Sequence, residues 1–168
     1  MTLIESYSAG PSGPAVRDIT IGQSLAEVAQ KFPERIALVA GVLERTMRRQ
    51  WTYGELLNQA LTAANALLQR FQPGDRVVVW APNIPEWVLL EYGCALAGVV
   101  LVTANPALQA EEIAYLLKQS RAVGIFALPE CRGNRMLQHV EQVREECPEL
   151  REVIRLDQWP VFMAAGFA

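Results

Sequence analysis

The 168-residue sequence lacks both common glycine-rich phosphate-binding motifs. A GxGxxG pattern after a strand would indicate a dinucleotide-binding turn, and GxxxxGK[ST] would indicate a P-loop. Neither occurs, and the loop after the most regular predicted strand, Ala81-Pro82-Asn83, has no glycine cluster and no lysine. The residues alone therefore predict no nucleotide site. A small nucleotide-binding α/β protein is a hypothesis that titration with ATP or NAD would test.

Histidine and cysteine are scarce. The single histidine, His139, has no neighbouring pattern typical of a catalytic triad, and we interpret it as a solvated surface side chain on a helix. The cysteines, Cys94, Cys131 and Cys147, are odd in number and form no CxxC, which predicts free thiols in a reducing cytoplasm. Cys131, His139 and Cys147 are eight residues apart along a predicted helix, too far to share one metal ion.

Positive charge is not in excess either. Lys and Arg number 15 against 18 Asp and Glu, giving a net charge of -3. Nucleic-acid binding depends on a basic surface that neutralises phosphates, so a nucleic-acid partner is not expected.

One long apolar run, Trp87 to Ala104, raises the possibility of a membrane span. Glu91 falls inside it, Gly93 and Gly98 interrupt it, and no cluster of Lys or Arg flanks it. A buried helix followed by a buried strand explains the run better, so no transmembrane segment is predicted. Met1 to Pro14 also lacks the pattern of a signal peptide, and we predict a flexible tail over residues 1–18.

What the sequence does contain is an alternation of strands and helices. The β-branched runs Arg76–Trp80 and Val99–Val102 do not alternate with polar residues, as expected of parallel strands buried on both faces. The helix predicted between them, residues 84–97, is apolar nearly all round and ends at Gly98. Other predicted helices cover residues 24–32, 53–70, 110–120 and 134–146, and other strands cover 36–40, 46–51, 122–127 and 152–156. This predicts an α/β fold with a mainly parallel sheet flanked by helices on both faces, in an order of strands that the sequence does not reveal.

Several polar residues have a structural explanation. Three pairs have capping-box spacing and predict helix starts: Ser24 with Glu27, Thr52 with Glu55, and Asn83 with Glu86. Asn83 is therefore interpreted as a helix cap and not as a binding residue. Glu111 and Glu112 are interpreted as first-turn charges that favour the helix dipole.

Aromatic and basic residues are explained in the same way. We interpret the tryptophans Trp51, Trp80 and Trp87 as packing residues. The basic cluster Arg45, Arg48 and Arg49 is interpreted as a solvated turn, with a phosphate contact as the lesser alternative.

Five segments together resemble a known family. They are WTYGEL (51–56), PGDRVVVWAPNIPEW (73–87), GCALAGVVLVTANPAL (93–108), EEIAYLLKQSRAVGIFA (111–127) and LDQWPVFMAAG (156–166). In this order they resemble the opening of the adenylate-forming (AMP-binding) superfamily, and within it the acyl-CoA synthetases or fatty-acid–CoA ligases. The resemblance runs from about Ile19 to the end, so residues 19–168 are expected to form an incomplete N-terminal part of the family's large domain.

The resemblance implies a two-step reaction. A carboxylic or fatty acid reacts with ATP and Mg²⁺ to give an acyl-adenylate and pyrophosphate, and the thiol of CoA then displaces AMP to give acyl-CoA. Family members use a large N-terminal domain and a small mobile C-terminal domain.

The family's catalytic segments have no counterpart in the sequence. These are the Thr/Ser/Gly-rich phosphate loop followed by Pro-Lys-Gly, the adenine and acyl-pocket segments, the ribose-binding aspartate and the C-terminal lysine, and the resemblance places all of them downstream of Ala168. No catalytic, cofactor-binding or metal residue is therefore assigned. The chain alone is expected to bind no cofactor and to be inactive. The alternative is a non-catalytic interaction module, or a truncated remnant, that pairs with a full-length synthetase through its exposed, incomplete sheet.

Overall fold

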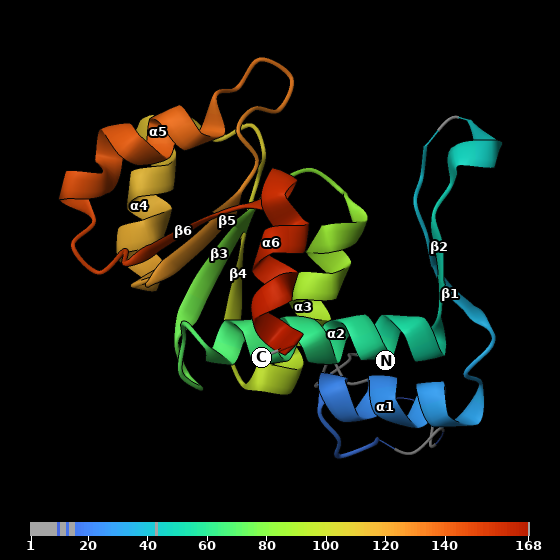
Figure 1. The fold of residues 1–168 in the computed structure, drawn as a ribbon. Coiled ribbons are helices and arrows are strands. Elements are labelled where there is room, and N and C mark those ends of the chain that lie inside the picture. The colour runs from blue at the N-terminus through green and yellow to red at the C-terminus, as the bar shows by residue number, and fades with distance from the viewer. Residues whose placement is uncertain (1–9, 11–12, 14–15, 43, 168) are drawn as a thin grey trace, which may run out of the picture.

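The fold is built on a four-stranded sheet in which all neighbouring strands are parallel (Figure 1). The computed structural model describes residues 10, 13, 16–42 and 44–167, so most of the predicted tail lies outside the described residues. The strands are β3 (Arg76–Trp80), β4 (Val100–Ala104), β5 (Gly124–Ala127) and β6 (Glu152–Arg155), in the order β4-β3-β5-β6. The predicted parallel sheet is confirmed, and the two strands at its centre are β3 and β5.

Helices cover both faces of this sheet (Figure 1). One face carries α2 (Tyr53–Leu68), α3 (Pro85–Ala97) and α6 (Trp159–Ala164), with α1 (Ile21–Lys31) packed against α2 and α3. The other face carries α4 (Ala110–Ser120) and α5 (Met136–Val143). Short 3-10 helices lie at Arg45–Met47, Arg144–Glu146, Leu156–Gln158 and Ala165–Phe167.

The side chains of β3 show why its sequence does not alternate. Val77 and Val79 pack under α2 and α3, whereas Val78 and Trp80 pack under α4 and α5. All four are fully buried. Burying a side chain of this kind contributes roughly 1.5–3 kcal/mol to the stability of the fold, so the side chains on both faces of β3 stabilise this strand. The apolar run therefore reflects a core on each side of the sheet.

The helix α3 is apolar nearly all round because it packs against both the sheet and α2. Leu89, Leu90 and Cys94 are buried in this contact. A Cβ at Gly93 would lie 2.9 Å from the Cβ of Ala63, so a glycine is needed where α3 approaches α2. Gly98 ends α3 in the left-handed region, with φ 69, as predicted.

The buried face of α2 differs from the predicted one. The helical spacing of the apolar residues in this segment predicts that Leu61 and Leu68 face inward with the other leucines, but these two side chains are 44% and 46% exposed. Ala63 and Ala66 are fully buried in their place. Because α3 lies close to α2, the contact selects small residues, whereas the prediction followed the large ones.

The N-terminal helix begins earlier than predicted. Its capping box is formed by Thr20 and Gln23: the Gln23 amide donates to Thr20 Oγ1 at 3.1 Å, and the Thr20 amide donates to Gln23 Oε1 at 2.8 Å. The predicted box of Ser24 with Glu27 is therefore wrong. The box of Thr52 with Glu55 is confirmed at the start of α2.

A second, two-stranded antiparallel sheet joins β1 (Ile36–Val39) and β2 (Gln50–Thr52), and it extends away from the main body (Figure 1). The strand predicted over 46–51 is wrong in its first half. The Glu44 carboxylate accepts hydrogen bonds from the amide and hydroxyl of Thr46, which holds this segment in a 3-10 turn.

Other element bounds differ by a few residues. The strand predicted at 99–102 begins at Val100 and continues to Ala104, and the strand predicted at 122–127 begins at Gly124. The helix predicted over 134–146 is shorter at its start and ends in a 3-10 turn. These ends differ because they depend on tertiary contacts and not on local pattern.

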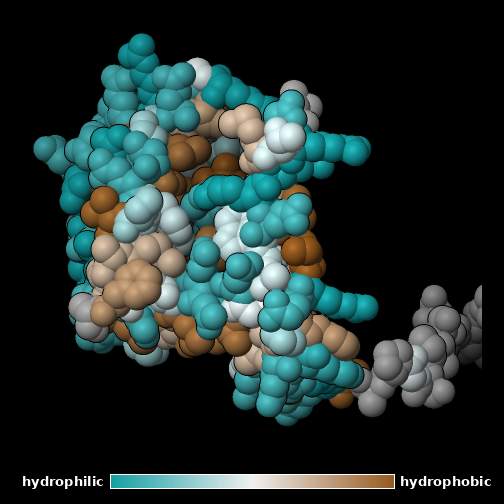
Figure 2. Space-filling view, turned by 45° about the vertical axis from the view of Figure 1, so that its right-hand side comes forward, coloured by the Kyte–Doolittle hydropathy of each residue, from teal (hydrophilic) through white to brown (hydrophobic). Residues whose placement is uncertain are grey.

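The surface carries apolar side chains among polar ones, as Figure 2 shows for one face. Tyr115 and Val161 are 66% and 70% exposed. Within the described ranges, none of the helices combines the length and the apolar character needed to cross a membrane.

The three cysteines generate a prediction about thiol reactivity. Burial raises the pKa of Cys94 to about 12, and burial also raises the pKa of Cys147. Cys131 is only half-buried. At pH 8, iodoacetamide should modify Cys131 first, while Cys94 should react only on unfolding, because the thiolate is the reactive form. Mass spectrometry of timed samples measures this order.

The same pKa shift affects stability at high pH. The unfolded chain releases the Cys94 proton near pH 8.5, whereas the folded chain retains it up to about pH 12. The free energy of unfolding should therefore fall as pH rises above about 8.5. In the iodoacetamide experiment at pH 8, equal labelling rates for Cys94 and Cys131 in the folded protein would contradict the burial of Cys94.

Candidate functional site

The candidate site is an open pocket of about 1080 Å³ at the carboxyl ends of the parallel strands. Its walls come from the loops after β3, β4 and β5 and from the first turns of α5. The loop after β3 turns toward the face covered by α2 and α3, whereas the loops after β4 and β5 turn toward the face covered by α4 and α5. Such a divergence opens a crevice, and ligands in α/β sheets bind at this position.

The loop after β4 is held in place by the buried Trp80. Its indole Nε1 donates a hydrogen bond to the backbone oxygen of Asn105 at 2.9 Å. The Asn105 side-chain oxygen then accepts from the amide of Ala107, also at 2.9 Å. Gln109 Nε2 donates to the backbone oxygen of Ala107 at 3.0 Å. Trp80 thus packs the core with its rings and positions one wall of the pocket with its N–H.

The loop after β5 contains a tight turn. Cys131 and Asn134 exchange two backbone hydrogen bonds of 2.9 Å each. The two residues between them, Arg132 and Gly133, have φ values of 50 and 84. Positive φ at both central positions is the geometry of a type I′ turn, which is unusual for an arginine. The turn places Arg132 on the wall of the pocket.

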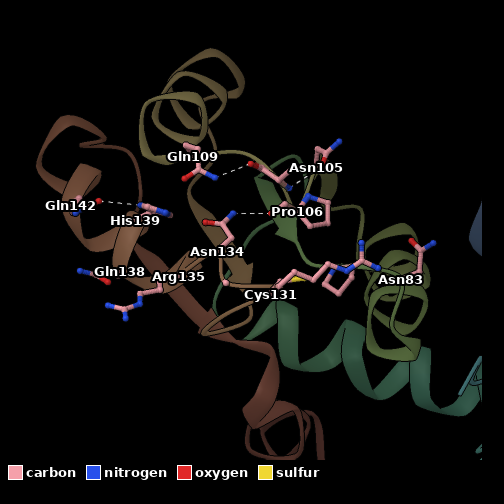
Figure 3. A pocket seen from close by; sticks show the side chains of 14 residues that line it. Asn83, Asn105, Pro106, Gln109, Cys131, Asn134, Arg135, Gln138, His139 and Gln142 are labelled. Atoms are coloured by element: carbon pink, nitrogen blue, oxygen red, sulfur yellow. Dashed lines mark hydrogen bonds between the residues drawn. The ribbon is translucent and has the colours of Figure 1, made fainter. Parts of the chain in front are cut away.

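Asn134 joins the two loops. Its Nδ2 donates to the backbone oxygens of Pro106 and Leu108, each at 2.8 Å, and Figure 3 shows it between the Pro106 loop and α5. Its Oδ1 is buried and has no hydrogen-bond partner among the described residues. A buried acceptor without a partner costs roughly 1–3 kcal/mol. Asn134 therefore links the two loops and fixes the shape of the pocket.

The charged side chains of the pocket are all cationic. Of the 14 lining residues, Arg132 and Arg135 carry charge, and none is an aspartate or glutamate. The remaining polar side chains are mostly amides, which can donate and accept hydrogen bonds: Asn83, Asn105, Gln109, Asn134, Gln138 and Gln142. A guanidinium presents a planar fork of donors that matches phosphate and carboxylate oxygens. The pocket is therefore suited to an anion.

The structure brings together three residues that the sequence left without a function. Asn83, Cys131 and His139 all line the pocket. The interpretation of Asn83 as a helix cap is wrong, because Ile84 is the N-cap of α3 and makes no side-chain cap hydrogen bond. His139 is half-buried, with its ring 6.5 Å from that of Trp80 and its Nδ1 3.1 Å from Gln142 Oε1.

The other candidates lie outside the pocket. Trp51 is buried in the core beneath α2, and Trp87 packs against that core. The basic cluster is exposed: Arg48 donates to the backbone oxygen of Val42, and Arg49 pairs with Glu86 at 2.8 Å. The Glu112 carboxylate caps α4 by accepting from the Gln109 amide.

The three residues whose spacing was considered for a metal site do not all lie together. Cys147 is buried behind α4, with its sulfur 4.0 Å from the backbone oxygen of Ala114, and does not line the pocket with Cys131 and His139. In the described part of the chain, no three His, Cys, Asp or Glu side chains are grouped so that they could hold a metal ion.

Most residues of the site were not identified from the sequence. Gln109, Arg132 and Asn134 lie outside the five segments that resemble the family, and Asn105, which lies in one of them, was given no role. The available signal was positional: Asn105 directly follows β4, and Arg132 and Asn134 lie in the loop between β5 and α5, so these residues meet at the carboxyl edge of the sheet.

The linking role of Asn134 predicts a measurable loss of stability. Replacing Asn134 with Ala removes two side-chain hydrogen bonds, each contributing about 0.5–1.5 kcal/mol, and should lower the free energy of unfolding by about 1–3 kcal/mol in urea titrations. Hydrogen exchange should also quicken in residues 105–109. Gln138→Ala, an exposed change in the same pocket, is the control. Equal effects of the two variants would contradict the linking role.

Comparison with known proteins identifies one family for this chain. A family model described as "AMP-binding enzyme" matches residues 25–166. The medium-chain acyl-CoA ligase ACSF2, mitochondrial, of Pongo abelii is 38% identical over 146 residues, covering 86% of this chain and 23% of that protein. The putative acyl-CoA synthetase YngI of Bacillus subtilis is 36% identical over 134 residues, covering 79% of this chain and 23% of that protein.

Solved structures share the fold. The N-terminal domain of FACL13 from Mycobacterium tuberculosis superimposes with a TM-score of 0.75 at 24% identity, covering 87% of this chain and 36% of that one. At this identity the similarity concerns the fold. This chain spans about a quarter of the length of the curated relatives that it matches. Since the family model covers most of the chain, the chain belongs to the AMP-binding enzyme family.

Proposed function

We propose that the chain contributes the N-terminal portion of an AMP-forming acid–CoA ligase. In the complete reaction, a carboxylate attacks the α-phosphate of ATP and releases pyrophosphate, and the thiol of CoA then attacks the acyl-adenylate and releases AMP. Two observations support this proposal: the family model that matches residues 25–166, and the names of the curated relatives, which are acyl-CoA ligases and synthetases.

The pocket at the carboxyl ends of β3, β4 and β5 carries the structural part of the proposal. Its two arginines suit the phosphate-bearing nucleotide portion of one of the co-substrates, CoA or ATP. Its volume of about 1080 Å³ is sufficient for such a group. The sequence predicted no bound cofactor for the isolated chain, and the pocket leads us to propose weak binding of this portion instead.

The same residues do not fit magnesium. Mg²⁺ prefers carboxylate oxygens together with water and substrate phosphates, and the lining residues include no carboxylate. We therefore assign no metal ligand within the pocket, and we place the chemical steps outside it. Phosphoryl and acyl transfer need donors aimed at the reacting atoms, and two exposed arginines serve binding only.

A non-catalytic assembly role is the second candidate function. The observation that favours it is the edge of the sheet at β4, where the described residues provide no further strand. The predicted cytoplasmic location stays a prediction, since one relative's name includes "mitochondrial" and another relative is bacterial.

A titration tests the pocket. Calorimetry with CoA, dephospho-CoA and ATP should detect binding to the chain, and Arg132→Ala with Arg135→Ala should weaken it at least about tenfold, because charge-assisted hydrogen bonds contribute more than neutral ones. The ligand with the tightest binding identifies the co-substrate. The control is Arg45→Ala with Arg48→Ala, an exposed pair outside the pocket. Absent binding, or equal weakening by both pairs, would contradict the assignment.

An activity assay tests whether the chain alone catalyses the first step of the reaction. Purified chain, given ATP, Mg²⁺ and fatty acids of several lengths, should release no pyrophosphate above a protein-free blank. A full-length homologue serves as the positive control. Acid-dependent turnover by the 168-residue chain would show that it holds a complete active site and would overturn this part of the proposal.

A further inference from the structure

The two edges of the sheet differ in charge. The edge strand β6 begins with Glu152, which pairs with Arg70 at 2.8 Å, and ends with Arg155, which pairs with Asp157 at 2.7 Å. Charged side chains of this kind discourage the addition of another strand. The other edge strand, β4, has the sequence VLVTA, without charge or proline, and its register with β3 is continuous over all five residues. Of the two edges of the four-stranded sheet, β4 is therefore the one suited to pairing.

The backbone groups at this edge can be identified from one hydrogen bond. The Val100 amide donates to the backbone oxygen of Asp75 at 2.8 Å, so Val100 faces the side of β3. The N–H and C=O of one residue in a parallel strand point to the same side, and successive residues alternate. The N–H and C=O groups of Leu101 and Thr103 therefore point to the open edge.

An apolar groove runs beside this edge. It lies between β4 and α4, has a volume of about 550 Å³, and is lined by Val102, Leu108, Tyr115 and Leu116 among others. Tyr115, at the middle of α4, is 66% exposed, and Val100, at the start of β4, is 47% exposed. Groove and edge together form one surface, which we call the β4–α4 surface.

Charges lie at opposite ends of the β4–α4 surface. Glu111 and Glu112 line the groove near the carboxyl end of β4, where α4 begins. Arg76 and Arg121 line a shallow hollow at the amino end of β4, where α4 has ended. None of these four side chains takes part in an ion pair within the described part of the chain. The surface is therefore acidic at one end and basic at the other.

We propose that two copies of this chain associate through their β4–α4 surfaces. A two-fold axis at Val102 places β4 antiparallel to its copy, so that the open backbone groups of Leu101 pair with those of Thr103 of the partner subunit. The same axis places the two α4 helices side by side with Tyr115 at the centre. It also brings the acidic end of one surface to the basic end of the other, which is the complementarity that specifies a second copy.

This association is closed because it has a two-fold axis. Each copy uses the β4 edge of its four-stranded sheet, and the charged β6 edges lie at the two outer ends of the joined sheet. The product is therefore a dimer and not an open chain of subunits.

Sedimentation equilibrium over a range of concentrations tests the dimer. Tyr115→Lys places two like charges at the axis and should raise the dimer dissociation constant at least about tenfold. Val161→Lys is the matched control, because Val161 is 70% exposed on α6, away from this surface, and its dimer should dissociate as the unaltered chain does. Circular dichroism melts establish that both variants fold.

A charge exchange tests the orientation of the two copies. Glu111→Arg and Arg121→Glu should each weaken the dimer several-fold, and the double variant should restore it, because each charge faces its opposite on the partner subunit. A monomer at every concentration, assemblies larger than two, equal effects of Tyr115→Lys and Val161→Lys, or a double variant weaker than both single variants would overturn the proposal.

Discussion

The burial of β3 on both faces is the constraint on which the rest of the structure depends. Val77 and Val79 need a helical layer on one side, and Val78 and Trp80 need another on the opposite side. The chain meets both needs by sending α3 to one face and α4 and α5 to the other, with β4 and β5 on the two sides of β3. This divergence also opens the crevice in which the pocket lies, so the core and the candidate site have one cause.

The pocket depends on a few polar contacts above that core. Trp80 fixes the Asn105 loop through its indole N–H, and Asn134 ties the turn after β5 to the same loop. Arg132 reaches the pocket wall because the turn holds it at a positive φ, a conformation that L-residues adopt at a cost. This local strain lies where the two cationic side chains of the pocket are found, and strained residues often cluster at functional sites.

The sequence predicted the structure correctly where an element depends on near neighbours or on a strongly apolar run. RVVVW predicted β3, Gly98 predicted the end of α3, and Thr52 with Glu55 predicted the start of α2, because each depends on near neighbours. It failed where distant contacts decide. The close approach of α3 selects Ala63 over Leu61 on α2. Asn83 lines the pocket because Ile84, and not Asn83, is the N-cap of α3. Asn134 could not be assigned from sequence, since its partners lie 26 and 28 residues away.

We place phosphate binding in the pocket of this member of the AMP-binding enzyme family, and one measurement tests this placement most directly. Nuclear magnetic resonance of the ¹⁵N-labelled chain during titration with CoA, and separately with ATP, reports which amides sense the ligand. We expect the largest shifts at Ala107, Arg132, Gly133 and Asn134, with little change in β1 and β2. Shifts confined to other parts of the chain, or none up to millimolar ligand, would contradict the account.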